Sequence, residues 1–198
     1  MKIGRLLASV ALVCGLTAGA LAQDAKKPAA KSDEQMMAEM MKLAKPGEGH
    51  DRLKPLAGAW KTTVKMWNKP GEEPQVSQGE CTDQWIMDGR YMKEECSGTF
   101  ADMPFQGMGI TGYDNAKKIY VSNWIDTMGT GIMSSTGSVD KTGKTFTYRS
   151  TMPDPATGKP MKVRMTTKVV DNDSHVFAMY VPAGPKEFMM MEITYTRK

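Results

Sequence analysis

The segment ECTDQWIMDGRYMKEEC (Glu80–Cys96) holds two runs of alternating character on either side of Asp88-Gly89. Asp-Gly between two such runs is a strong signal for a β-hairpin with a two-residue turn. With the turn at this dipeptide, position i pairs with position 177 − i. Cross-strand partners share one face of the sheet. The pairs in this register are Cys81 with Cys96, Asp83 with Glu94, and Trp85 with Met92.

The two cysteines of this hairpin are expected to form a disulfide. Directly opposed residues of an antiparallel pair have Cα atoms about 4.5–5.5 Å apart, a separation that a disulfide accepts. A register slip by one residue would turn the two sulfur atoms to opposite faces. The hairpin therefore predicts a Cys81–Cys96 crosslink rather than a reactive or metal-binding cysteine pair.

The same alternation continues on both sides of the hairpin, from Gly58 to the end of the chain. Short runs rich in Thr, Val, Ile, Tyr, Phe and Met are separated by turn signals such as Lys141-Thr142-Gly143 and Asn172-Asp173. These signals delimit about nine or ten strands. No long helical pattern interrupts them, which argues against a fold of alternating strands and helices. The spacing predicts an all-β antiparallel meander that closes as a sandwich or barrel.

Parity along the strands separates a wet face from a buried one. In Met161–Val169, the charged residues Lys162, Arg164 and Lys168 lie on one face and the apolar residues on the other. The directions of three aromatic residues, Trp85, Tyr113 and Trp124, are left open by this pattern. With them, the residues expected to line the lumen are Met66, Trp85, Tyr113, Trp124, Tyr148, Met165, Met189, Met191 and Tyr195.

The N-terminal region precedes the strands and divides into two parts. Residues 1–22 have the basic start, the short apolar run and the Ala20-Leu21-Ala22 site of a signal peptide. Residues 23–44 read as a flexible leader followed by a short methionine-rich helix, which Ser32 and Gln35 would cap. The strand domain is expected over residues 45–198. The mature protein is thus predicted to be exported, periplasmic or secreted, without membrane insertion after cleavage.

Net charge gives no support for a polyanionic partner. The formal net charge is +4, and removal of the signal peptide would lower it to +2, with the basic residues scattered along the chain. Nucleic acid is therefore not expected as a partner. The sequence carries no signal for an oligomeric state.

Several motifs together resemble a bacterial family catalogued as domain of unknown function 1579. They include WIMDGRYM, PFQGMGITGYDNAKKIYVSNWIDTMGTGI and MMEITYTRK, and the likeness covers roughly residues 45–198. The resemblance implies a calycin- or lipocalin-like β-barrel and brings no established activity. In LAGAW and YTRK, Trp60 and Arg197 match the calycin pattern in which a basic residue of the last strand covers a tryptophan of the first. Such a pair would close the barrel by a cation–π contact.

Catalytic candidates are few. His50 precedes the strands, and the strand carboxylates Asp83, Glu94 and Asp126 could act with it as acid and base. No G-x-S-x-G motif is present, and both mature cysteines are assigned to the disulfide. An enzyme that uses His50 and a strand carboxylate at the barrel mouth is one alternative.

Metal handling is a second alternative. Met36, Met37, Met40 and Met41 could bind Cu(I), because thioethers are soft ligands. A stripe that packs on the barrel, or a helix that stays mobile, is the other interpretation. For heme, His50 and His175 are the available imidazoles. The mature chain has no zinc-type ligand spacing, and no cofactor is predicted. We expect a non-enzymatic barrel that binds or carries a small apolar molecule in its lumen.

Overall fold

The computed structural model describes residues 31–154 and 156–198, so the expected signal peptide and most of the leader lie outside the described residues. Ten antiparallel strands form a closed barrel in which each strand pairs with its neighbours in sequence and β1 pairs with β10. The expected all-β barrel is therefore confirmed. The strands are β1 (Gly58–Met66), β2 (Gln75–Ile86), β3 (Tyr91–Phe100), β4 (Met103–Asp114), β5 (Ile119–Asp126), β6 (Met133–Val139), β7 (Thr145–Pro153), β8 (Pro160–Val169), β9 (Ser174–Ala183) and β10 (Lys186–Arg197).

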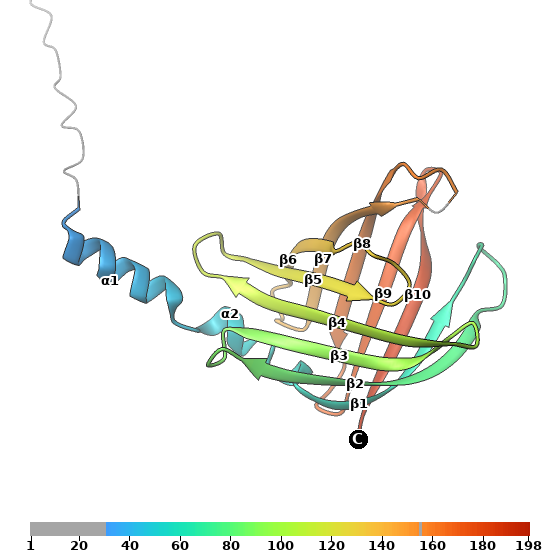
Figure 1. Cartoon of the computed structure of the whole chain (residues 1–198), viewed down its shortest axis with the longest axis horizontal. Helices are drawn as coiled ribbons and strands as arrows, with labels where there is room; N and C mark the ends of the chain where they lie inside the picture. The colour runs from blue at the N-terminus through green and yellow to red at the C-terminus, as the bar shows by residue number, and fades with distance from the viewer. Residues whose placement is uncertain (1–30, 155) are drawn as a thin grey trace, which may run out of the picture.

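From residue 31 onward, three short helical elements precede the barrel: α1 (Asp33–Ala44), α2 (Glu48–Asp51) and the 3₁₀ helix η1 (Lys54–Leu56). Helix α1 has the predicted capping box, because the Ser32 hydroxyl accepts from the Gln35 amide and the Gln35 side chain accepts from the Ser32 amide. In Figure 1, α1 projects away from the barrel, whereas α2 lies beside the ends of β2 to β5. None of the described helices has the length and apolar character needed to cross a bilayer.

The two ends of the barrel differ in how tightly they are packed, and the buried core lies toward one of them. At the closed end β1 begins and β10 ends, and Leu53 and Leu56, beside and within η1, are buried there. These leucines join a continuous buried cluster with Tyr120, Phe146 and Val169. The opposite end holds the β1–β2 and β9–β10 turns and is called the open end below, because none of the described helices lies there (Figure 1). The packed core therefore occupies the closed part of the barrel.

The register of the β2–β3 hairpin agrees with the sequence prediction. Cys81 pairs with Cys96, Asp83 with Glu94, and Trp85 with Met92. Turn residues Met87, Asp88 and Gly89 all have positive φ, so the Asp-Gly dipeptide lies within a slightly longer turn than two residues. Cys81 and Met92 are both buried in core clusters. The carboxyl pair, which shares their face, therefore faces the barrel interior.

Candidate functional site: the inner wall of the barrel

The predicted disulfide is present on the inner wall. Cys81 and Cys96 are bonded, with Cα atoms 4.1 Å apart. Cys81 is buried against Trp60 and Tyr195, so the crosslink forms part of the apolar packing. Cys96 Sγ also lies 3.4 Å from a carboxyl oxygen of Glu94. The sulfur atoms and this carboxylate lie close enough together for a metal, but both sulfurs are committed to the disulfide.

Asp83 and Glu94 form a pair of carboxyl groups next to this crosslink. They are direct register partners on β2 and β3. Burial, and then the neighbouring charge of Glu94, raise the pKa of Asp83 to about 9. Burial likewise raises the pKa of Glu94. Two carboxyl groups in an apolar enclosure resist ionisation for these reasons, and they share protons as a coupled pair.

Tyr195, on β10, reaches the carboxyl pair from across the disulfide. Its hydroxyl donates to Glu94 Oε1 at 3.0 Å. Burial, and then the charges of Glu94 and Asp83, raise the pKa of Tyr195 well above its ordinary value. The phenol therefore stays protonated and acts as a fixed donor to the carboxyl pair. Within the described residues, neither Asp83 nor Glu94 forms an ion pair with a basic side chain.

The imidazole of His175 stacks on the ring of Tyr195. The sequence did not reveal this contact, because His175 follows a turn. The two rings stack with centroids 4.1 Å apart, and Trp60 meets the imidazole edge-on at 4.5 Å. His175 is buried, and its Nδ1 has no hydrogen-bond partner in the described part of the chain. Burial, and then the charge of Arg197, lower its pKa to about 4. This histidine is consequently neutral at physiological pH and is enclosed by aromatic rings.

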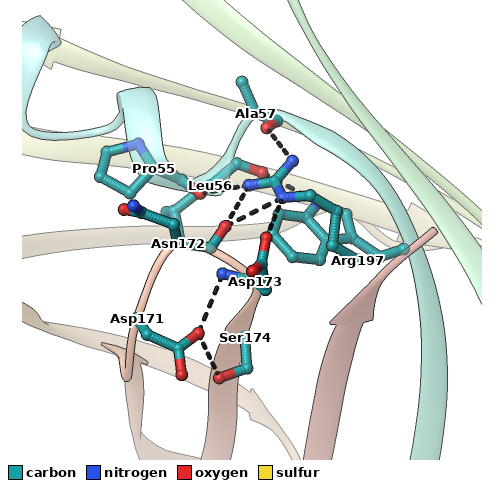
Figure 2. A network of polar contacts seen from close by, with 9 residues as sticks. Pro55, Leu56, Ala57, Asp171, Asn172, Asp173, Ser174 and Arg197 are labelled. Atoms are coloured by element: carbon teal, nitrogen blue, oxygen red, sulfur yellow. Dashed lines mark hydrogen bonds and ion pairs between the residues drawn. The ribbon is translucent and has the colours of Figure 1, made fainter.

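Arg197 covers Trp60 at the closed end, as the calycin pattern implies. Its guanidinium carbon lies 4.2 Å from the ring centroid. Figure 2 shows the same guanidinium donating to the main-chain carbonyls of Ala57 and Asn172, beside Asp173. The Trp60 indole N–H donates to the carbonyl of Leu56. These bonds join η1, the β8–β9 turn and the end of β10 into one closure.

Gly58 is required by this closure. It has a φ of +148°, and a Cβ at this position would collide with the Arg197 guanidinium. A side chain is therefore excluded at Gly58 both by conformation and by the close approach of the arginine.

His50 lies at the closed end, away from the barrel mouth where the enzyme alternative would use it. It is buried in α2, its Nδ1 accepts from the Gly47 amide at 3.2 Å, and its ring meets Tyr113 edge-on. Burial lowers its pKa. Asp126 accepts from the Trp124 indole at 2.8 Å. The structure therefore gives His50 and Asp126 separate local partners and brings together only Asp83 and Glu94 among the four catalytic candidates.

Most of the expected lumen residues do face the interior. Tyr148 and Met165 are buried in the core cluster, and Tyr195 is buried in the second cluster beside the disulfide. Trp85, Tyr113 and Met191 pack against the core while remaining partly exposed. Met66 pairs directly with Met191, and Trp124 pairs with Met133, which also packs against the core. These pairings give Met66 and Trp124 the same inward face.

Met189 is the exception. The β10 register shifts between Met189 and Met191, and Met189 pairs with Tyr180. The Tyr180 ring lies under the Arg164 guanidinium, 3.9 Å from its carbon, on the outer face. The irregularity turns Met189 outward and lets Met190 pack against the core instead. Strict alternation along β10 could not reveal this change of face.

The methionine stripe of α1 does not pack on the barrel. Met36, Met37, Met40 and Met41 are 47–66% exposed, and α1 has no buried residue. The side chain of Asn115 donates to the carbonyls of Leu43 and Lys45, which fixes the end of the helix through its main chain. The interpretation that this stripe covers part of the barrel is therefore wrong.

The outer surface carries a different kind of hollow. A depression of about 760 Å³ lies over β2 to β5, and its lining mixes polar residues such as Thr82 and Glu95 with apolar ones such as Met108 and Ile125. Thr82 and Glu95 pair on the face opposite to Asp83 and Glu94. This outer hollow is thus separated by the barrel wall from the carboxyl pair.

Comparison with known proteins places the chain in a family. The model of the family described as "Protein of unknown function (DUF1579)" matches residues 45–197, so the chain belongs to this family. Among solved structures, the chain is similar to Rv2717c from M. tuberculosis, with 15% identity, a TM-score of 0.54, and coverage of 78% of this chain and 99% of that one. A redesigned β-barrel matches at 18% identity and a TM-score of 0.41, over 74% of this chain and 95% of the other. No curated protein matches the sequence.

Proposed function

We propose that this protein binds a small, largely apolar molecule in the open half of its barrel, without catalysing a reaction. The observation that carries the proposal is a gradient of exposure along the inner wall. Near the closed end, inward residues such as Phe146 and Met165 are buried. Toward the open end, inward residues such as Met161 and Met191 remain partly exposed although they pack against the core.

Partly exposed apolar side chains inside a barrel favour a ligand. The free energy of the system decreases when an apolar molecule displaces the water that contacts them. Methionine suits such a wall, because its flexible thioether adapts to different shapes. The inward methionines at this end include Met66, Met152, Met161 and Met191.

The disulfide supports a location outside the cytoplasm. Stable crosslinks of this kind form and persist in oxidising compartments. Together with the signal-peptide pattern of residues 1–22, this bond supports export and a role in an oxidising space such as the periplasm.

Native mass spectrometry of the full-length product purified from its own host tests this proposal first, with a bound small molecule as the expected result. A titration with octanol by calorimetry is the second measurement. Met191→Trp, which fills the open end, should weaken octanol binding. The matched control is Met36→Trp, on the exposed helix α1, which should leave binding unchanged. If Met191→Trp keeps both the bound small molecule and its full affinity for octanol, the lumen is not the binding site.

A further inference from the structure

We propose that the methionine patch of helix α1 is a binding site for Cu(I), separate from the lumen and independent of the function proposed for it. The patch consists of Met36, Met37, Met40 and Met41. In the described chain, these four side chains are 47–66% exposed and α1 has no buried residue. By contrast, methionines such as Met92 and Met165 are buried in the barrel core. The fold therefore leaves four thioether sulfur atoms accessible to a ligand on one short helix.

The spacing of the four methionines places them at the corners of one surface. The two consecutive pairs, Met36-Met37 and Met40-Met41, lie on successive turns of α1. Residues four apart in a helix, such as Met36 and Met40, have Cβ atoms about 5–6 Å apart, and residues three apart, such as Met37 and Met40, are also neighbours. The methionine side chain is unbranched and has three rotatable bonds. The sulfur atoms can therefore converge on one ion above the patch.

The choice of methionine adds sulfur to this face and little else. Leucine, which α1 has at Leu43, would make an apolar face equally well, and its helix propensity is close to that of methionine. Thioethers are soft ligands that select Cu(I) over harder divalent ions. They also remain available in an oxidising compartment, where two neighbouring thiols would pair off, as Cys81 and Cys96 do. The residue type therefore favours Cu(I) in the compartment that the disulfide supports.

Both ends of α1 are fixed, so the patch exists before the ion binds. At its start, the capping box joins Ser32 and Gln35. At its end, the side chain of Asn115, in the β4–β5 turn, donates to the carbonyls of Leu43 and Lys45. A site that is already formed loses less conformational entropy when a ligand binds.

The charges of α1 also favour a cation at the patch. Within the helix, Asp33, Glu34 and Glu39 outnumber the single basic residue, Lys42. Glu39 immediately precedes Met40, and Asp33 lies on the same face as the patch, one turn before it. These carboxylates attract a cation held between the thioethers. The helix thus combines soft ligands with a negative surrounding charge.

Titration of the purified protein with Cu(I), in competition with bicinchoninate and with ascorbate present, tests the proposal. About one ion per chain is expected, and X-ray absorption should show only sulfur atoms bound to the copper. The affinity should change little between about pH 6 and 8, because a thioether loses no proton on metal binding, whereas imidazole and thiol ligands do. The charged neighbours of the patch are carboxylates and an ammonium, which titrate in model peptides at about pH 4 and pH 10; they are Asp33, Glu34, Glu39 and Lys42.

Replacing all four methionines of the patch by leucine separates copper binding from an apolar contact, because leucine keeps the helix and its apolar face but removes the sulfur. This variant should lose the bound ion while its circular dichroism spectrum stays that of the wild type. The matched control is Met103→Leu with Met128→Leu, which removes two other exposed methionines and should keep the ion. Retention of Cu(I) by the four-leucine variant, or failure of the wild type to bind it, would overturn the proposal.

Discussion

The hydroxyl of Tyr195 on β10 donates to Glu94 on β3 at 3.0 Å, across 101 positions of sequence. Strands β1 and β2 lie between these two strands in the barrel, so the bond spans the disulfide on the inner wall. Tyr195→Phe should reduce the free energy of unfolding by about 1–3 kcal/mol. It should also raise the pKa of Glu94 further, because the hydrogen bond favours the carboxylate. Urea unfolding and NMR titration of the side-chain carboxyl measure the two effects, and Tyr91→Phe, on an exposed ring, is the control.

The carboxyl pair should make the protein less stable in alkaline solution. Between pH 7 and 9 an unfolded Asp83 is ionised, whereas the folded residue, with a pKa raised to about 9, retains its proton. The folded state then holds more protons, so the free energy of unfolding decreases as the pH rises through this window, by at most about 1.4 kcal/mol per pH unit for one proton. Urea unfolding at pH 7 and pH 9 measures this slope. Asp83→Asn should flatten it, and an unchanged slope in that variant would assign the effect to another group.

Loss of the disulfide should destabilise the barrel without changing its strand order. Cys81 and Cys96 are separated by 15 positions, and closure of a loop of this length contributes roughly 3 kcal/mol in the loop-entropy model. The double variant Cys81→Ser, Cys96→Ser should lose about this much in urea unfolding. Reductant should shift the wild-type transition and have no effect on the variant. A stability loss well below about 1 kcal/mol would mean that the crosslink adds little to the packing around it.

Arg197 should not be replaceable by lysine. Lysine keeps the charge over Trp60 but lacks the planar fork that reaches the carbonyls of Ala57 and Asn172 together. Arg197→Lys should lower the free energy of unfolding by about 1.5–3 kcal/mol, the range for hydrogen bonds to a charged group. Arg149→Lys, at an exposed position on β7, is the matched control. Equal stability of the two variants would show that the charge alone closes the barrel.

The α1 methionines should be dispensable for the barrel. Since Met36, Met37, Met40 and Met41 are exposed and α1 has no buried residue, replacing all four by serine should change the free energy of unfolding by less than about 0.5 kcal/mol. The far-ultraviolet circular dichroism transition in urea measures this. A larger loss would show that the stripe does contact the barrel in solution.

Features governed by local pattern were predictable from the sequence. The register of the β2–β3 hairpin follows from Asp88-Gly89 and alternation, and it correctly placed the disulfide and the pairing of Asp83 with Glu94. The antiparallel meander followed from the repeated strand-and-turn pattern. Its closure as a barrel and the contact of Arg197 with Trp60 followed from a family resemblance.

Features that depend on packing were not predictable. The irregularity in β10 shifts Met189 to the outer face, and no turn residue marks it. His175 follows a turn in sequence, yet Trp60 and Tyr195 enclose it, because strands distant in sequence meet there. The amphipathic stripe of α1 indicated a buried face, but the helix extends beyond the surface that could have covered it.

The pairing of β1 with β10 has a consequence for the order of folding. Trp60 meets Arg197 across almost the whole length of the strand domain, so this contact cannot form until the intervening hairpins have brought the two strands together, and long-range closure of this kind is slow. The β2–β3 hairpin, by contrast, is local and can be oxidised early. Until β1 pairs with β10 and closes the barrel, each of these strands has an unpaired edge, and an edge of this kind is prone to aggregation. Arg197 and Gly58 are therefore the positions at which substitutions should slow refolding and reduce the yield of recovered protein.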